Sequence, residues 1–245
     1  MLKCIEVSKR FGGLQALKNV NFTVDSGEIA GLVGPNGSGK STLLNLISGV
    51  YKPDSGQILF LDEDISKMQS YKICVRGITK TAQTVQSFPE MTAIENVQTS
   101  VLFNDKKNAV NSDSLSKAQE LLTFVRLSKD KFDVPAKNLN VIELRRIQLA
   151  KALATNPKLL LLDELLTGLT PKESDEAIEL IKQINKQGVT ILIVEHVMRV
   201  IMGLCNRVVV LHHGEKICDG SPKTVCSDEN VVKVYLGKRF TFGEE

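Results

Sequence analysis

Short apolar runs with the composition of β-strands alternate along the chain with helical patterns. Near the N-terminus these runs are LKCIEV, VNFTV, EIAGLVG and GQILFLD. Farther along, KLLLLDE and VTILIVEH lack polar alternation and are separated by the helical stretch KESDEAIELIKQINKQG, which ends at Gly188. Strands without alternation, separated by helices, are typical of a parallel sheet that is covered on both faces. The pattern therefore predicts an α/β fold with a mostly parallel sheet.

A long helical pattern, from about residue 85 to residue 155, interrupts the series of strands. Residues 104–120 within it are polar and predict a solvated loop that leads into a helix at SLSKAQELLTFVRL. We therefore predict a single domain over residues 1–245. Its α/β core consists of residues 1–84 and 156–245, and residues 85–155 form a helical subdomain inserted into that core.

Length and composition are those of an ordinary globular protein. The chain has 245 residues, of which 42% are hydrophobic and 24% are charged, and this is enough for one large domain with a buried core. The formal net charge is +3, and Lys and Arg are spread along the chain instead of being grouped in blocks. This distribution does not support a surface for binding nucleic acid.

No segment of the sequence is predicted to cross a membrane. The N-terminal MLKCIEVSKRFGG lacks the apolar run of a signal peptide. The most apolar region, GVTILIVEHVMRVIMGLCNRVVVL, is interrupted by Glu195, His196, Arg199, Asn206 and Arg207, which a spanning helix would rarely contain. We therefore expect that the chain does not span a membrane by itself.

The cysteines and histidines do not indicate a disulfide framework or a structural metal site. The 5 cysteines include no CxxC pair, and an odd number favours a reducing cytosol over paired disulfides. No cysteine lies at finger-like spacing from a histidine. His212 and His213 fall in RVVVLHHGEKICDG, which predicts a solvated hairpin with its turn at His213 and Gly214.

The segment GPNGSGKS, residues 34–41, matches the phosphate-binding pattern GxxxxGK[ST] between a predicted strand and a predicted helix. Glycines let successive backbone N–H groups point into one concavity, and the start of the helix adds its positive end. We expect Lys40 to reach the β- and γ-phosphates and Ser41 to ligate Mg²⁺. The predicted nucleotide-binding residues here are Gly34, Asn36, Gly37, Ser38, Gly39, Lys40, Ser41 and Thr42.

The segment LLLLDE predicts the second half of the same site. Its apolar residues bury a strand and bring Asp163 to the end of that strand, where a carboxylate can hold a metal ion. Glu164 is then placed to polarise the attacking water. An apolar run that ends in two acids is common on its own, and it indicates a nucleotide site because the phosphate loop accompanies it.

Together these motifs resemble those of the ATP-binding subunits of ABC transporters, over nearly the whole chain. KRFGGLQALKNVNFTV is similar to their N-terminal core, TAQTVQSFPEMTAIENV to their glutamine loop, and LIVEH to their switch-histidine segment. The resemblance implies the ABC ATPase fold, in which a P-loop NTPase core carries an antiparallel β subdomain and an inserted helical subdomain. It also implies that Phe11 stacks on the adenine ring and that His196 lies near the γ-phosphate. Gln83 is implied to bind Mg²⁺ and to contact the attacking water. The alternatives are a core position for Phe11 and a hydrogen-bonded strand end for His196.

Several segments are more similar to the subfamily that serves uptake of branched-chain amino acids and related compounds. They are KRFGGLQAL, QSFPEMTAIENV, GLTPKE, VEHVMRVIM and the C-terminal YLG. This likeness leaves a urea or other amide importer as an alternative. It implies transmembrane permease subunits touched through SFPEMT, a second ATPase subunit, and, indirectly, a periplasmic or extracellular substrate-binding protein. It also implies a peripheral position on the cytoplasmic face of the cell membrane.

One segment, LNVIELRR, departs from the family pattern. Members of the family begin this helix with an LSGGQ-like signature that contacts the ATP held by the opposite subunit. The alignment puts Asn140 at the serine, Ile142 at the second glycine and Glu143 at the glutamine. Asn140 can still donate to nucleotide and start a helix, whereas the branched Ile142 resists the close approach that glycine permits. A smaller departure is Leu165, which replaces a proline after the two acids.

Because the signature acts in trans, its change would affect the partner's ATP. We therefore hypothesise a heterodimer in which the strong hydrolytic site is built on this chain, with a homodimer of two weakened sites as the alternative. A regulatory subunit that binds ATP with little or no turnover is a further alternative. A soluble ATPase of DNA repair or translation is less favoured, because such proteins usually have a long coiled-coil insertion or two fused cassettes. The residues retained for this chain's own ATP are Lys40, Ser41, Gln83, Asp163, Glu164 and His196.

Overall fold

The computed structural model describes residues 1–81, 87–104 and 112–236, and its central element is a six-stranded sheet. The strand order is β10-β9-β3-β8-β7-β6, and every neighbouring pair is parallel except β9 and β10. The prediction of a mostly parallel sheet is therefore confirmed. The strands are β3 (Ile29–Val33), β6 (Ile78–Lys80), β7 (Leu159–Asp163), β8 (Thr190–Val194), β9 (Arg207–His212) and β10 (Glu215–Gly220).

Alternate residues of the central strands face two different hydrophobic cores. In β7, Leu160 and Leu162 belong to a core shared with helices on one face, while Leu159 and Leu161 belong to a core on the other face. All five residues of β7 are buried, as are those of β3 and β8. Burial on both faces explains why the sequence of these strands shows no polar alternation.

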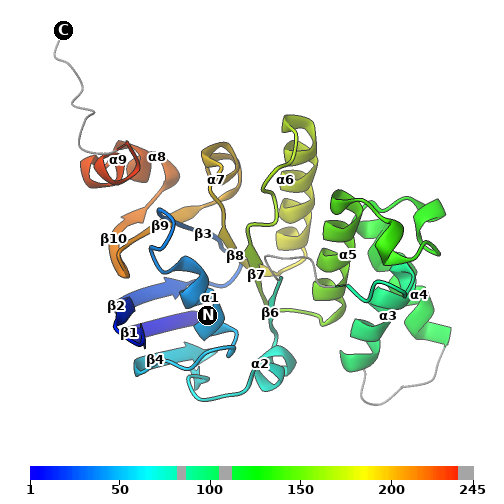
Figure 1. Ribbon diagram of the computed structural model, residues 1–245, viewed down its shortest axis with the longest axis horizontal. Coiled ribbons are helices and arrows are strands. Elements are labelled where there is room, and N and C mark those ends of the chain that lie inside the picture. Colours follow the sequence, from blue (N-terminus) through cyan, green and yellow to red (C-terminus); the bar gives the residue numbers. More distant parts are fainter. Residues whose placement is uncertain (82–86, 105–111, 237–245) are drawn as a thin grey trace, which may run out of the picture.

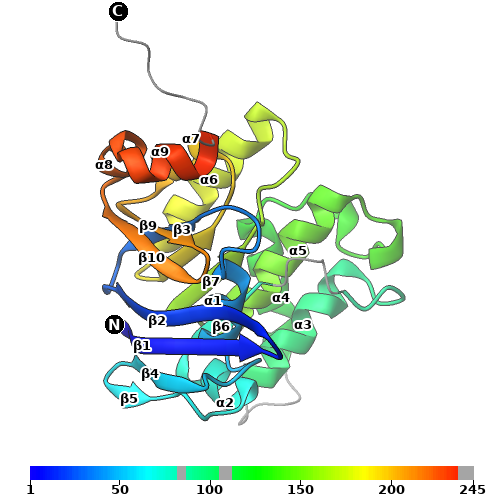
Figure 2. The same cartoon turned by 60° about the vertical axis from the view of Figure 1, so that its left-hand side comes forward.

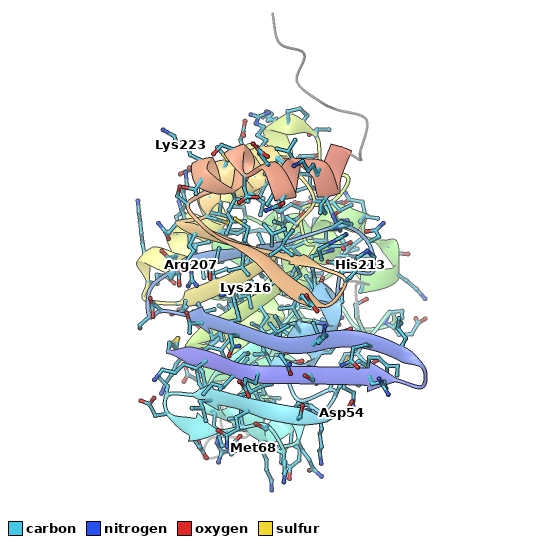
Figure 3. The ribbon with its side chains drawn as sticks, turned by 90° about the vertical axis from the view of Figure 1, so that its left-hand side faces the viewer. Asp54, Met68, Arg207, His213, Lys216 and Lys223 are labelled. Carbon is cyan, nitrogen blue, oxygen red and sulfur yellow. The ribbon has the colours of Figure 1, made fainter. Side chains whose placement is uncertain are left out.

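A second, antiparallel sheet lies over the central one, with helix α1 (Lys40–Ile47) between them (Figure 2). The apolar residues of α1, with Leu43 and Leu44 fully buried, share one core with both sheets. Arg207, labelled in Figure 3, joins the two sheets because its Nη1 donates to the carbonyl oxygen of Thr23 at 3.2 Å. The strands of this sheet, in the order β2-β1-β4-β5, are β1 (Leu2–Phe11), β2 (Leu14–Val24), β4 (Ser55–Phe60) and β5 (Glu63–Asp64).

Three of the helices form a group of their own beside the central sheet. Helices α3 (Ala93–Asn104), α4 (Ser112–Phe124) and α5 (Val141–Ala154) pack together at one end of the central sheet (Figure 1). Near them lie the short 3-10 helices η1 (Lys129–Lys131) and η2 (Ala136–Asn138). The division of the chain near residues 84 and 155 stays a prediction. The remaining helices are α2 (Ser70–Arg76), α6 (Pro171–Lys186), α7 (Met198–Leu204), α8 (Pro222–Ser227) and α9 (Glu229–Leu236).

Some elements differ from the sequence-based expectation. Strand β2 begins at Leu14, well before VNFTV, because it pairs with β1 from Phe11 onward. Helix α4 begins at Ser112, inside the stretch expected to be a loop. The hairpin with its turn at His213 and Gly214 is confirmed, since His212 pairs with Glu215. In the described residues no helix is long and apolar enough to cross a membrane.

Leu192→Ala tests how far stability depends on the core between the two sheets. Leu192 lies in β8 and is completely buried, so truncation leaves a cavity and should cost about 2–5 kcal/mol of unfolding free energy. Leu115→Ala on the exposed side of α4 is the matched control and should change it by less than about 0.5 kcal/mol. Urea denaturation followed by circular dichroism measures both, and equal losses would contradict the assignment of the core.

Candidate nucleotide-binding site

The loop between β3 and α1 has a conformation that only glycine accommodates at two of its positions. Gly34 has a φ of 150° and Gly39 a φ of 105°. A Cβ on Gly34 would lie 2.1 Å from the carbonyl oxygen of Leu211, and one on Gly39 would lie 2.7 Å from that of Ala16. Helix α1 then starts without a side-chain cap, so its first N–H groups stay available for an anion.

Lys40 is held inside this loop. Its side chain is buried, and Nζ donates to the carbonyl oxygens of Gly34 at 2.8 Å and Pro35 at 2.9 Å. Burial lowers the pKa of Lys40, while the charges of Glu164 and Asp163 act in the opposite direction. The ammonium group is therefore kept at the phosphate loop and close to both acids.

The phosphate loop forms one wall of an open hollow, and the tip of the β1–β2 hairpin forms another. Phe11 at this tip is 39% exposed, and its ring meets Tyr51 edge to face at a centroid distance of 5.2 Å. An exposed aromatic ring beside a phosphate loop is suited to stack on a planar base. The lining residues are Phe11, Leu14, Gln15, Ala16, Asn36, Gly37, Ser38, Gly39, Lys40, Ser41, Thr42, Glu164 and His213.

Asp163 lies at the end of β7, and only one of its two carboxylate oxygens has a partner among the described residues. Its Oδ2 forms an ion pair with Lys80 Nζ at 3.1 Å, and Lys80 also donates to Asn45 Oδ1 at 2.6 Å. Its Oδ1 is buried without a hydrogen-bond partner among the described residues. An orphaned carboxylate oxygen near the hydroxyl-bearing phosphate loop provides the hard oxygen ligands that Mg²⁺ prefers. The sequence did not single out Lys80, because one basic residue shortly before the glutamine loop forms no recognisable motif.

Glu164 and His196 meet at the ends of two neighbouring parallel strands. His196 Nε2 lies 2.8 Å from Glu164 Oε1, and the amide of Glu164 donates to the carbonyl oxygen of Val194 at 3.0 Å. Glu164 has a φ of 52°, in the left-handed region. The structure therefore brings together the two residues that the sequence placed in different motifs. Gln83, expected beside them, lies outside the described residues.

Glu195 is a buried acid in this region that sequence reasoning did not assign. It is 1% exposed, and its Oε1 accepts a 2.7 Å hydrogen bond from the Leu166 amide. Its Oε2 has no hydrogen-bond partner among the residues that the structure describes. Burial raises the pKa of Glu195, and the charge of Glu164 adds to the effect. The only signal for Glu195 in the sequence was its position as an acidic residue directly after an apolar strand.

Asn140 does not line this hollow, and it caps helix α5. Its contact with the ATP of the opposite subunit stays a prediction. Its Oδ1 accepts from the amide of Glu143 at 2.9 Å, while Glu143 Oε2 accepts from the amide of Asn140 at 2.9 Å. The other oxygen of Glu143 lies 3.7 Å from Lys131 Nζ. The Glu143 carboxylate thus turns back onto its own helix end. Ile142 instead faces an apolar groove with Leu165.

The chain is similar to known proteins over almost all of its length. A family profile described as "ABC transporter" matches residues 17–167. The LivG protein of Escherichia coli K12, described as a high-affinity branched-chain amino acid transport ATP-binding protein, is 35% identical, with 94% of each chain covered. The ADP conformation of MJ1267, an ATP-binding cassette, is 31% identical with a TM-score of 0.87, covering 97% of this chain and 99% of that one. The dimeric MJ0796 cassette bound to ADP and phosphate is 28% identical with a TM-score of 0.84, covering 91% and 99%.

Lys40→Met should weaken ATP binding by about tenfold or more, because the loop loses the charge that meets the phosphates. Isothermal titration of ATP into the wild type and the variant measures the change. Lys233→Met is the matched control, because Lys233 is an exposed residue of α9 in an ion pair with Glu229, and it should leave the affinity unchanged. Equal affinities for the wild type and Lys40→Met would place the phosphates elsewhere.

Proposed function

The chain belongs to the ABC transporter family of ATP-binding proteins, and we propose from this premise that it binds and hydrolyses ATP to drive a membrane transporter. The observation that carries the proposal is the 2.8 Å contact between Glu164 and His196 at the sheet edge that also holds the phosphate loop. This edge combines groups that hold phosphate with a carboxylate able to accept a proton from water. The comparisons give no support to a regulatory subunit without turnover.

Each group in the site has its own proposed role in hydrolysis. Backbone N–H groups of the phosphate loop and Lys40 hold and neutralise the β- and γ-phosphates. Glu164 orients the attacking water and accepts its proton, while His196 fixes the direction of the Glu164 carboxylate. Mg²⁺, for which Ser41, Asp163 and Gln83 are the proposed ligands, would supply positive charge to the phosphate oxygens. Phe11 would stack on the adenine ring.

We assign the transported substrate to branched-chain amino acids or related amino acids and amides. Support comes from the LivG relative, whose description is that of branched-chain amino acid transport, and from its similarity over 94% of this chain. The proposed partners are transmembrane permease subunits and a second ATPase subunit, with a periplasmic or extracellular substrate-binding protein acting indirectly. The chain would then lie on the cytoplasmic face of the cell membrane, held there by the permease subunits.

The second ATPase subunit is proposed to be a different chain. A signature loop must bring small residues close to the partner's γ-phosphate. Here Ile142 faces a groove, and Glu143 places a carboxylate at the start of α5. By contrast, this chain retains the groups proposed to act on its own ATP, which are the phosphate loop, Asp163, Glu164 and His196. A heterodimer would therefore have its strong site on this chain.

ATP turnover of the purified chain on its own should be slow, because LNVIE would then be the signature loop at both sites. It should still rise more steeply than linearly with protein concentration, because each site is completed by a second subunit. Glu164→Gln should abolish this turnover, since the amide cannot accept a proton from water. Steady-state phosphate release over a range of concentrations measures both. A linear rise that persists in Glu164→Gln would show that the activity does not come from this site.

Restoring the family residues at three positions of the signature tests the proposed asymmetry. The triple variant Asn140→Ser, Ile142→Gly, Glu143→Gln should raise turnover of the chain on its own by about tenfold or more, because donors to the γ-phosphate are regained. Glu120→Gln on α4 is the control for a change of charge in the helical region and should leave the rate unchanged. If the triple variant is no faster than the wild type, the loop LNVIE is already competent and the reason for a heterodimer disappears.

A further inference from the structure

We propose that Glu195 is a positioning residue for hydrolysis, which holds the chain just after Glu164 in place through the Leu166 amide. This inference rests on the proposed function, because the placement of Glu164 matters only if Glu164 acts on water. The sequence presented Glu195 only as a charge that interrupts an apolar segment. The structure gives the same residue a specific partner next to the catalytic acid.

Strands β7 and β8 lie side by side (Figure 1), and hydrogen bonds between the residues at their ends lie on both sides of Glu164. Before the turn, the Glu164 amide donates to Val194 at 3.0 Å. After the turn, the Leu166 amide donates to Glu195 Oε1 at 2.7 Å. The Glu164 side chain contacts His196 between them, at 2.8 Å. Removal of the Glu195 acceptor would release one of the two backbone anchors of the catalytic acid.

The backbone of Glu164 needs such anchors. Its φ of 52° lies in the left-handed region, which is unfavourable for a residue with a Cβ and persists only where the surroundings impose it. The left-handed turn sends the chain from the end of β7 into the loop that leads to α6. If the Leu166 amide were free, Glu164 could relax toward ordinary dihedral angles. Its carboxylate would then no longer point toward His196.

The surroundings of Glu195 do not favour a carboxyl group for stability alone. The side chain is 1% exposed, and one of its oxygens has no hydrogen-bond partner among the described residues. Burial and the charge of Glu164 raise its pKa, although the hydrogen bond from the Leu166 amide acts in the opposite direction, so the ionised form is disfavoured there. An apolar side chain of similar volume would fill this space without that cost. The contribution of Glu195 is therefore the acceptor that it offers to Leu166.

Two substitutions of similar volume distinguish the effect of this hydrogen bond from the effect of filling the same space. Glu195→Gln keeps an acceptor for the Leu166 amide, and Glu195→Met removes it. We expect Glu195→Met to lower kcat by about tenfold or more while the KM for ATP changes by less than about twofold. Glu195→Gln should stay within about threefold of the wild-type kcat, because its amide oxygen accepts the same hydrogen bond.

Two controls distinguish positioning from loss of folded protein. The number of ATP molecules bound per chain, measured by titration, should be the same in the wild type and both variants. Val225→Ala removes two methyl groups from a buried residue of α8 and should lower the melting temperature without changing kcat. A fall in kcat that follows either the bound ATP or the melting temperature would overturn the positioning role.

Exchange of the Leu166 amide proton tests the contact without using hydrolysis. In protein labelled with ¹⁵N-leucine and free of nucleotide, this amide should exchange at least about tenfold faster in Glu195→Met than in the wild type or Glu195→Gln. Equal exchange in the three proteins, or equal kcat in the two variants, would overturn the proposal. If wild-type turnover does not exceed that of Glu164→Gln, the proposed function fails, while the exchange rates still show whether Glu195 holds Leu166.

Discussion

The parallel pairing of β7 and β8 is the constraint on which the rest of the site depends. Their register places Asp163 opposite Val194, so the residues that follow each strand emerge at the same edge of the sheet. Glu164 and His196 are 32 positions apart in the chain and still come within 2.8 Å of one another. Because both strands are buried on both faces, a slip of one residue would move apolar side chains into the site and carboxylates into the core.

The same edge concentrates charge that a protein interior normally excludes. Lys40 is buried among loop carbonyl oxygens, Asp163 is paired with Lys80, and one oxygen of Glu195 has no partner in the described part of the chain. Buried ions of this kind cost stability unless they are well paired. The two cores of the sheet offset the cost, since they surround the strands from both sides. The phosphates of a bound nucleotide would add a partner for Lys40, which carries a positive charge.

Much of the fold and the main motifs follow from the sequence, because they depend on local patterns. Fully apolar strands, the phosphate loop and the hairpin at Gly214 are set by burial, glycine geometry and short-range pairing. Short elements such as α2 and β6 leave no comparable pattern, since their positions depend on neighbours far along the chain. Lys80 and Glu195 were missed for the same reason. Their partners, Asp163 and Leu166, are distant in sequence or involve a backbone amide, which no side-chain motif encodes.

The segment LNVIELRR shows how a helix can begin stably with a sequence that departs from the family signature. Asn140 and Glu143 form a reciprocal cap, so the start of α5 satisfies its own amides without any ligand. A glycine at position 142 is unnecessary for that cap, and Ile142 gains contact with an apolar groove instead. The stability of the start of α5 therefore does not require the small residues of the family signature. A requirement for those residues would come from contact with a nucleotide and not from the folding of this helix.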